Sequence, residues 1–101
     1  MLSKASEKAQ ERMKAHRVDE NQQEIVAAFR RCGASVQHLH EVGQGCPDIL
    51  VGLRGCNLLV EIKNGDAPLN PVERDWHAAW RGQVAIVRSV EEAVKLCESA
   101  S

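Results

Sequence analysis

Two short apolar runs, Ile49–Leu53 and Leu58–Ile62, constrain the fold of this 101-residue chain more than any other feature. A turn-forming Arg-Gly-Cys-Asn segment separates them. Apolar runs of this length around a turn predict a β-hairpin of two largely buried strands. The hairpin also fixes the positions of three charges, because Asp48 stands at its entrance while Glu61 and Lys63 stand at its far end.

The geometry of the turn decides which side chains face each other across the hairpin. A two-residue turn at residues 54–55 pairs Asp48 directly with Glu61. A four-residue loop around the same centre keeps this register, whereas a three-residue loop would break it. Directly opposed residues have Cβ atoms about 4.5–5.5 Å apart. Lys63 lies two residues beyond Glu61, so it projects from the same face of the strand.

Two opposed carboxylates repel each other unless a positive charge lies between them. A hard divalent cation meets this need, since Mg²⁺ binds one or two carboxylates and retains several waters. An ammonium group beside the pair could then orient an attacking water and offset charge that develops on a phosphate. The alternative is a purely structural ion pair, in which Lys63 neutralises Glu61 or Asp48 at the edge of a strand.

The flanking residues add a resemblance to a known family. Pro47-Asp48, twelve intervening residues and then Glu61-Ile62-Lys63 on a hairpin resemble the core motif of the PD-(D/E)xK nuclease superfamily. The Gly-Cys-Pro-Asp lead-in and the Leu-Asn-Pro…Trp continuation at residues 69–76 are most similar to its VRR-NUC branch, particularly the small stand-alone phage and prophage enzymes. The resemblance covers roughly residues 19–94, which is most of the chain.

The resemblance implies a Mg²⁺-dependent (or Mn²⁺-dependent) DNA endonuclease. Asp48, Glu61 and the backbone carbonyl of Ile62 would bind the metal, and Lys63 would orient the water that attacks phosphorus. The products would be a 5′-phosphate and a 3′-hydroxyl. Family members of this size tend to be homodimers that cut branched DNA, Holliday junctions in particular, in DNA recombination and repair. The alternative function is a non-catalytic DNA- or protein-binding module that retains the nuclease fold.

The sequence departs from the family pattern on its helices. Related nucleases often carry a glutamate on the first helix that helps to hold the metal, and Gln22 occupies that place here. Gln22 could position a water or cap the helix, and Glu24 could reach in from the flank. In related sequences a glutamine commonly occupies the place of Glu73. This glutamate either caps its helix or replaces the missing acid.

The remaining segments predict one α/β domain over residues 18–101. Helical periodicity and capping residues predict three helices, and alternating or apolar runs predict two strands besides the hairpin. The Trp76 and Trp80 side chains are expected in the core or at a subunit contact. The expected fold is a restriction-endonuclease-like αβββαβ core with a mixed, mostly four-stranded sheet flanked by helices. The expected elements are a helix over 19–33, a strand over 35–42, the hairpin, a helix from Asn70 to Gly82, a buried strand over 83–87 and a helix from Ser89.

Charge is distributed unevenly along a chain whose net charge is −1. Residues 1–17 carry five basic and two acidic groups, a net charge of +3, which leaves −4 on the rest. This segment is expected to be a partly helical tail, a helix exchanged with a partner subunit, or a basic arm that contacts DNA phosphates. No apolar run is long enough to span a membrane, and no signal peptide is evident, so we expect a cytoplasmic protein. The family resemblance implies that the cell is a bacterium or a phage-infected host. The arm residues that could contact DNA are Lys8, Arg12, Lys14 and Arg17.

The four cysteines show no paired zinc-ligand spacing. They are therefore interpreted as isolated thiols, mostly small core residues. One alternative metal site remains open on geometric grounds, because His38 and His40 would lie on one face of a strand. With Cys46 they could form a three-ligand zinc site in a zinc-dependent hydrolase, although polar positions near the site are the simpler interpretation.

Overall fold

A computed structural model describes residues 21–99 of the protein. The predicted basic arm over residues 1–17 and the start of the first helix near Asp19 lie outside the described residues. No helix within the described range is long and apolar enough to cross a membrane.

The predicted order of helix, three strands, helix, strand and helix is confirmed. The first helix is described from residue 21 to residue 31. One boundary was wrong: the first strand ends at His38 instead of continuing to residue 42, because the chain turns there and leaves Val42 61% exposed. The later elements are β1 (Ser35–His38), β2 (Ile49–Leu53), β3 (Cys56–Ile62), α2 (Pro71–Ala79), β4 (Val84–Val87) and α3 (Val90–Ser99).

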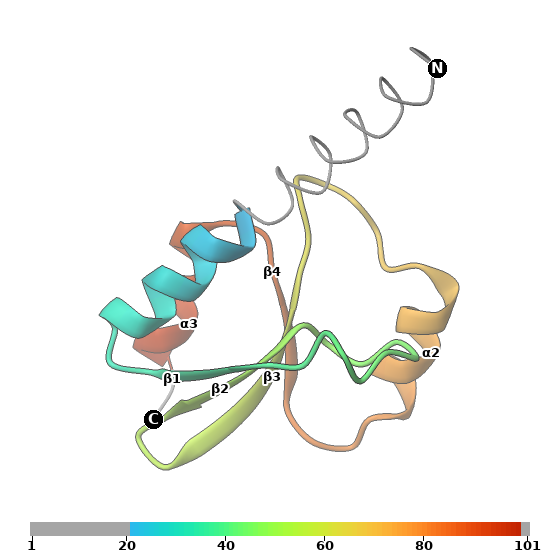
Figure 1. The fold of residues 1–101 in the computed structure, drawn as a ribbon, viewed down its shortest axis with the longest axis horizontal. Helices are drawn as coiled ribbons and strands as arrows, with labels where there is room; N and C mark the ends of the chain where they lie inside the picture. Colours follow the sequence, from blue (N-terminus) through green and yellow to red (C-terminus); the bar gives the residue numbers. More distant parts are fainter. Residues whose placement is uncertain (1–20, 100–101) are drawn as a thin grey trace, which may run out of the picture.

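The four strands form one mixed sheet in the order β1-β2-β3-β4. β1 and β3 each pair antiparallel with β2, whereas β4 lies parallel to β3. The parallel pair requires a crossover connection, and α2 lies within it. Figure 1 shows the helix of residues 21–31 and α3 on one side of β3 and β4, with α2 on the other.

The hairpin has the predicted register. Leu53 pairs with Cys56, and the ladder continues to the pairing of Ile49 with Val60. Arg54 (φ 52°) and Gly55 (φ 78°) both adopt left-handed backbone conformations, as a two-residue type I′ turn requires. The turn therefore holds the register on which the opposition of the two carboxylates depends.

The hydrophobic core lies between the sheet and the helix pair formed by residues 21–31 and α3. Val60 and Ile62 point into this core, so the intervening Glu61 points to the face that α2 covers. Ile25, Ala28 and Phe29 recur at helical spacing on the first helix and are buried, whereas Cys32, one turn further on, is half-buried. All four cysteines are free thiols. The core consists of Ile25, Val26, Ala28, Phe29, Ala34, Ile49, Val51, Val60, Ile62, Val87, Ala93 and Cys97.

Helix α2 packs differently from the prediction. Asn70 and Glu73 form the expected capping box, but the helix ends at Ala79 instead of reaching Gly82, and no α2 residue is buried. The core assignment of the tryptophans was therefore wrong: Trp76 is half-buried and Trp80 is 45% exposed. Their rings stack with centroids 4.7 Å apart.

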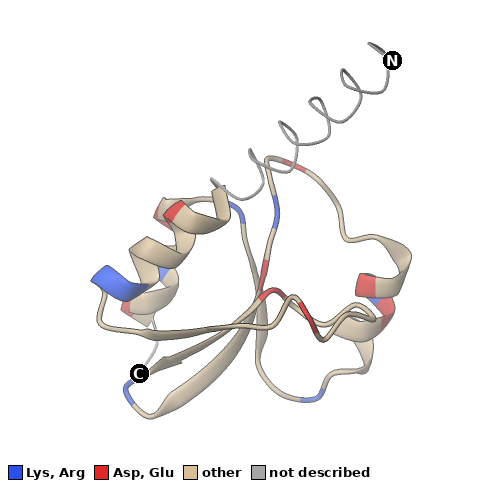
Figure 2. Ribbon diagram, in the orientation of Figure 1, with Lys and Arg blue, Asp and Glu red and all other residues tan. Residues whose placement is uncertain are grey.

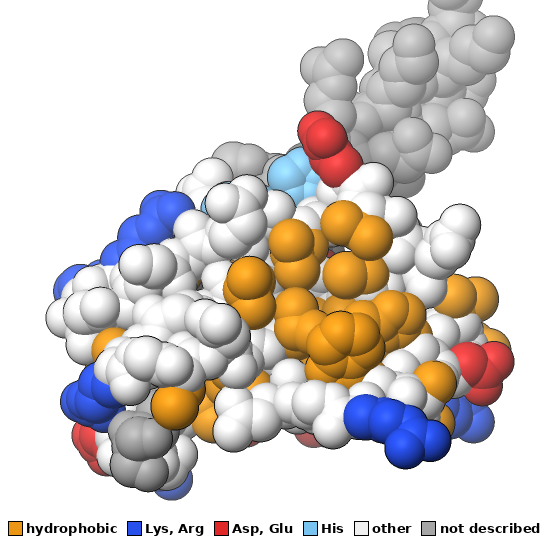
Figure 3. Space-filling model, turned by 90° about the horizontal axis from the view of Figure 1, so that it is seen from below, with side chains coloured by type: hydrophobic (Ala, Val, Ile, Leu, Met, Phe, Trp, Pro, Cys, Tyr) orange, Lys and Arg blue, Asp and Glu red, His pale blue; other side chains and the backbone are white. Residues whose placement is uncertain are grey.

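Several apolar side chains remain exposed outside the core. Ile86 of β4 was expected to be buried, but it is 37% exposed. Figure 3 shows hydrophobic side chains gathered on one face of the molecule. The exposed large hydrophobic residues of the described range are Val42, Val72, Trp80 and Ile86.

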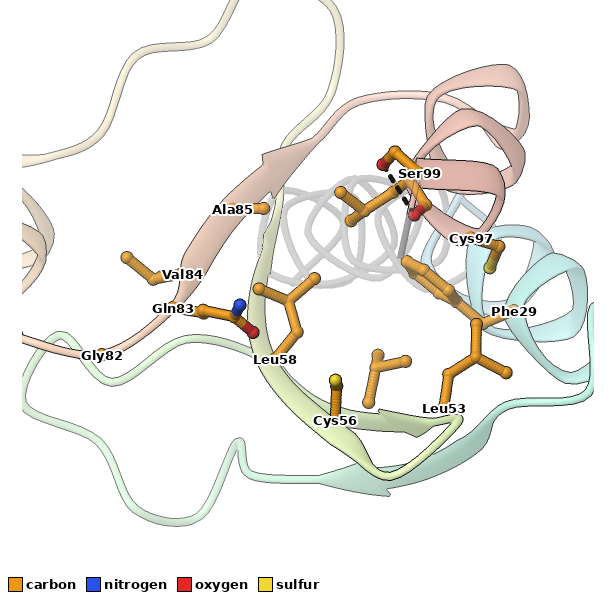
Figure 4. Close-up of a pocket in the computed structure, with 12 residues that line it drawn as sticks. Phe29, Leu53, Cys56, Leu58, Gly82, Gln83, Val84, Ala85, Cys97 and Ser99 are labelled. Carbon is orange, nitrogen blue, oxygen red and sulfur yellow. Dashed lines mark hydrogen bonds between the residues drawn. The ribbon is translucent and has the colours of Figure 1, made fainter. Parts of the chain in front are cut away.

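An apolar hollow of about 480 Å³ lies between the hairpin, β4 and α3 (Figure 4). Phe29, Leu58 and Leu96 are among its lining residues, and Arg54 Nη1 donates a hydrogen bond to the Cys97 carbonyl beside it. No ionisable residue other than cysteine lines the hollow. It therefore lacks the carboxylates that would bind a metal and the basic side chains that would activate a nucleophile. It lies on the opposite side of β3 from Glu61.

The loop before β2 contacts α2 through Gly45. A Cβ atom on Gly45 would lie 2.7 Å from the Val72 carbonyl oxygen, whereas one on Gly43 would contact nothing within 4 Å. Both glycines have positive φ, so Gly43→Ala is a matched control for backbone strain. We expect Gly43→Ala to cost about 1 kcal/mol and Gly45→Ala roughly 1–3 kcal/mol more through overpacking. Urea denaturation measures both, and equal losses would contradict the described contact with α2.

Candidate active site

The site lies where the hairpin strands open toward α2. Asp48 precedes β2 by one residue, and continuing the ladder by one pair places it opposite Glu61 of β3. Figure 2 shows acidic residues on the segment that enters β2 and on the adjacent part of β3, with a basic residue directly after β3. Asp48 is tied to β3, because its Oδ2 accepts a hydrogen bond from the Ile62 amide at 2.7 Å.

The same hydrogen bond orients the backbone of Ile62. In a β-strand the N–H and C=O of one residue point to the same neighbouring strand. The Ile62 carbonyl therefore points toward the Asp48 edge, and the next residue points the other way, since the Lys63 amide donates to the Val87 carbonyl of β4. The backbone oxygen that the family resemblance assigns to the metal thus faces the acid pair.

Glu61 is a buried carboxyl group with only 3% of its surface exposed. Burial raises its pKa to about 8, and the charge of Asp48 and a hydrogen bond with it act in the same direction. Glu73 raises the pKa further, whereas Lys63 opposes the shift. Without a cation, the site therefore holds a proton on this carboxyl group at neutral pH.

Lys63 lies between two carboxylates from different elements. Its Nζ is 2.6 Å from Glu73 Oε1 and 4.0 Å from Glu61 Oε2. The same Glu73 oxygen accepts the Asn70 amide in the capping box. Burial acts to raise the pKa of Glu73, but the hydrogen bonds from Lys63 and Asn70 outweigh it and lower the pKa. Glu73 therefore caps α2, as one interpretation expected, and it also binds Lys63. Its role as a replacement for the missing acid stays a prediction.

His77 is a site residue that the sequence analysis missed. Its Nε2 lies 3.8 Å from Glu61 Oε1. These two atoms are buried and have no hydrogen-bond partner. Every other buried side-chain nitrogen or oxygen of residues 21–99 has one. The available signal was spacing: His77 follows Glu73 by four residues, so the two share one face of a helix.

The other candidate residues do not contact Asp48, Glu61 or Lys63 through any hydrogen bond or ion pair described for residues 21–99. Gln22 Nε2 lies 3.5 Å from His38 Nδ1, and Glu24 is exposed. Asn21, one residue earlier, directs its side-chain amide toward the Lys63 carbonyl at 3.5 Å. Burial raises the pKa of the Cys46 thiol, and the nearby charges of Glu61 and Asp48 raise it further.

The donors present fit a hard divalent cation. Two carboxylates and a backbone oxygen are the ligand types that Mg²⁺ prefers, and a buried carboxylate oxygen without a partner is costly unless an ion or water meets it. Within residues 21–99 no three His, Cys, Asp or Glu side chains converge on one point to hold a metal. The alternative zinc site of His38, His40 and Cys46 is therefore not formed.

Comparison with known proteins finds a structure of similar fold. A solved structure described as a VRR_NUC domain superposes with a TM-score of 0.69 at 28% sequence identity, and the match covers 83% of this chain and 97% of that one. No protein-family model and no curated protein matches the sequence. The chain therefore has the VRR-NUC nuclease-like fold. This similarity indicates a nuclease domain.

The raised pKa of Glu61 predicts how stability depends on pH in the metal-free protein. Between its ordinary value of 4.5 and about 8, the folded chain holds a proton that the unfolded chain has lost. The free energy of unfolding should therefore fall as pH rises through this window, by a few kcal/mol in total. Denaturation in a chelator at several pH values measures this. Glu61→Gln should remove the fall, and an unchanged slope in that variant would contradict the assignment.

Proposed function

We propose that the protein is a Mg²⁺- or Mn²⁺-dependent endonuclease that hydrolyses DNA phosphodiester bonds. One observation carries this proposal: Glu61 is a buried carboxyl group opposite Asp48, with one oxygen that lacks a partner and a lysine ammonium 4.0 Å from the other. An acid pair in this state lacks a positive charge, and a divalent cation supplies it. The VRR-NUC fold supports the same conclusion.

Asp48, Glu61 and the Ile62 carbonyl would hold the cation. When bound, it would polarise a phosphate oxygen and increase the acidity of a bound water. The Ile62 amide fixes the orientation of Asp48, so the carboxylate needs little rearrangement to bind. Because the sheet holds both acids rigidly, they can position the scissile phosphate against the nucleophile.

Lys63 would orient the attacking water and offset the charge that develops on the phosphate. Its ammonium has three donors, and Glu73 engages at least one of them at 2.6 Å. This hydrogen bond fixes the side chain beside Glu61 and leaves donors for water and phosphate. Attack in line with the scissile bond would release a 3′-hydroxyl and leave a 5′-phosphate on the other fragment.

Replacing the proposed catalytic groups tests the activity. We expect Asp48→Ala, Glu61→Ala and Lys63→Ala each to lower Mg²⁺-dependent DNA cleavage at least about a hundredfold, as loss of a charge-stabilising group typically does. Glu91→Ala and Lys95→Ala are matched controls, because both residues are exposed on α3, across the sheet from the site. Cleavage at the wild-type rate by Asp48→Ala or Lys63→Ala would overturn the proposal.

A non-catalytic binding module is the second candidate. It is favoured by the absence, within residues 21–99, of a third side chain converging with Asp48 and Glu61. Calorimetry with Mg²⁺ and Mn²⁺ separates the two functions. A nuclease must bind metal at this pair and lose that binding in Asp48→Ala, whereas a binding module has no such requirement.

Branched DNA is the proposed substrate, and a homodimer the proposed active form. The described domain is a single small sheet with its helices, so DNA shape and subunit assembly are the available means of recognition. The exposed Val72, Trp80 and Ile86 offer apolar surface for a second subunit. Two sites related by a two-fold axis would match the symmetry of a four-way junction. The arm residues Lys8, Arg12, Lys14 and Arg17 would add contacts to DNA phosphates.

Assembly and substrate preference can be tested together. We expect light scattering to give a dimer at micromolar concentration, and Trp80→Glu to shift it toward monomer by placing a charge in the apolar contact. Cleavage of a four-way junction should be faster than cleavage of a flap, a nicked duplex or a linear duplex. A monomeric wild type without preference for the junction would contradict this part of the proposal.

A further inference from the structure

Helix α2 presents two polar side chains to the site, one helical turn apart. Glu73 binds Lys63, and four residues later His77 faces Glu61. The side chains of Glu61 and His77 are 4% and 12% exposed. Both side chains come from a helix that has no buried residue.

The contact between His77 and Glu61 is incomplete as it stands. Nε2 and Oε1 are 3.8 Å apart, which is too long for a direct hydrogen bond. Each atom is nevertheless buried and without a partner, and a buried group left in this state costs roughly 1–3 kcal/mol. At this separation a single water placed to one side could form hydrogen bonds with both atoms.

The surroundings are polar enough to hold such a water. A buried water needs two to four polar partners, and Glu61, His77 and the Lys63 ammonium, 4.0 Å from Glu61, supply them. Direct binding of a metal by His77 is the weaker alternative. No three His, Cys, Asp or Glu side chains within residues 21–99 converge on one point, and Mg²⁺ prefers oxygen ligands while retaining its waters.

We propose that His77 is a positioning residue of the nuclease site. Its Nε2 and Glu61 Oε1 hold a water that belongs to the hydration shell of the divalent cation at the acid pair. His77 thereby fixes the orientation of the Glu61 carboxylate and contributes to metal affinity without binding the metal itself. This inference rests on the proposed function, because it assumes that Asp48 and Glu61 bind a cation.

Two amide substitutions of different length test this role in the full chain. The amide of Gln can occupy the place of Nε2, whereas Asn is one methylene too short. We expect His77→Asn to weaken Mn²⁺ binding about 10–100-fold, as the loss of a group that supports a metal ligand does, and His77→Gln to stay within about threefold of wild type. Calorimetry measures both affinities. His40→Asn is the matched control, since His40 is exposed, and it should bind Mn²⁺ like wild type.

Pulsed electron paramagnetic resonance of the bound Mn²⁺ gives a readout that a merely structural role would not move. We expect the Mn²⁺ spectrum to lack the strong nitrogen coupling that a directly bound imidazole produces. A strong nitrogen coupling in wild type that disappears in His77→Gln would show direct binding and overturn the water-mediated placement. Melting of the metal-free variants shows whether both amides fold equally well.

The outcomes separate the two proposals. If wild type binds Mn²⁺ and Asp48→Ala does not, but His77→Asn binds as tightly as wild type, the role of His77 alone is overturned. If wild type and Asp48→Ala both fail to bind Mn²⁺, the proposed function is overturned, and this inference with it.

Discussion

The opposition of Asp48 and Glu61 across the β2–β3 hairpin is the constraint on which the site depends. A slip of one residue in this pairing would move every side chain of the strand to the opposite face. The left-handed turn at Arg54 and Gly55 holds the register, and the Ile62 amide holds Asp48 against β3. Backbone geometry therefore places the two acids opposite each other, and burial raises the pKa of Glu61.

In the metal-free protein, a charged Glu61 is energetically unfavourable. Burial and the neighbouring carboxylate raise the pKa of Glu61 to about 8, so the metal-free chain keeps a proton where a nuclease needs a cation. Lys63 offsets this charge only in part, because Glu73 engages it at 2.6 Å. Helix α2 is thus an electrostatic component of the site: it supplies the partner of Lys63 and, through His77, a second polar neighbour of Glu61.

Sequence patterns could predict those features that depend on local rules. The apolar runs and the turn predicted the hairpin and its register, and the capping box at Asn70 and Glu73 was visible as a motif. Tertiary packing decided the rest. The sequence could not predict how α2 would meet the sheet, which leaves Trp80 exposed and places the half-buried His77 beside Glu61. The early end of β1 at His38 likewise reflects a loop that crosses toward α2, as the contact of Gly45 with Val72 indicates.

Our main proposal is that Asp48 and the buried Glu61 together hold a divalent cation. A crystal structure of the full chain with Mn²⁺, phased so that anomalous scattering locates the metal, tests it most directly. We predict an anomalous peak within coordinating distance of Asp48, Glu61 and the Ile62 carbonyl, with Lys63 still beside the acid pair. Crystals with Mn²⁺ bound elsewhere, or with the two carboxyl groups joined by a shared proton at saturating Mn²⁺ and neutral pH, would contradict it.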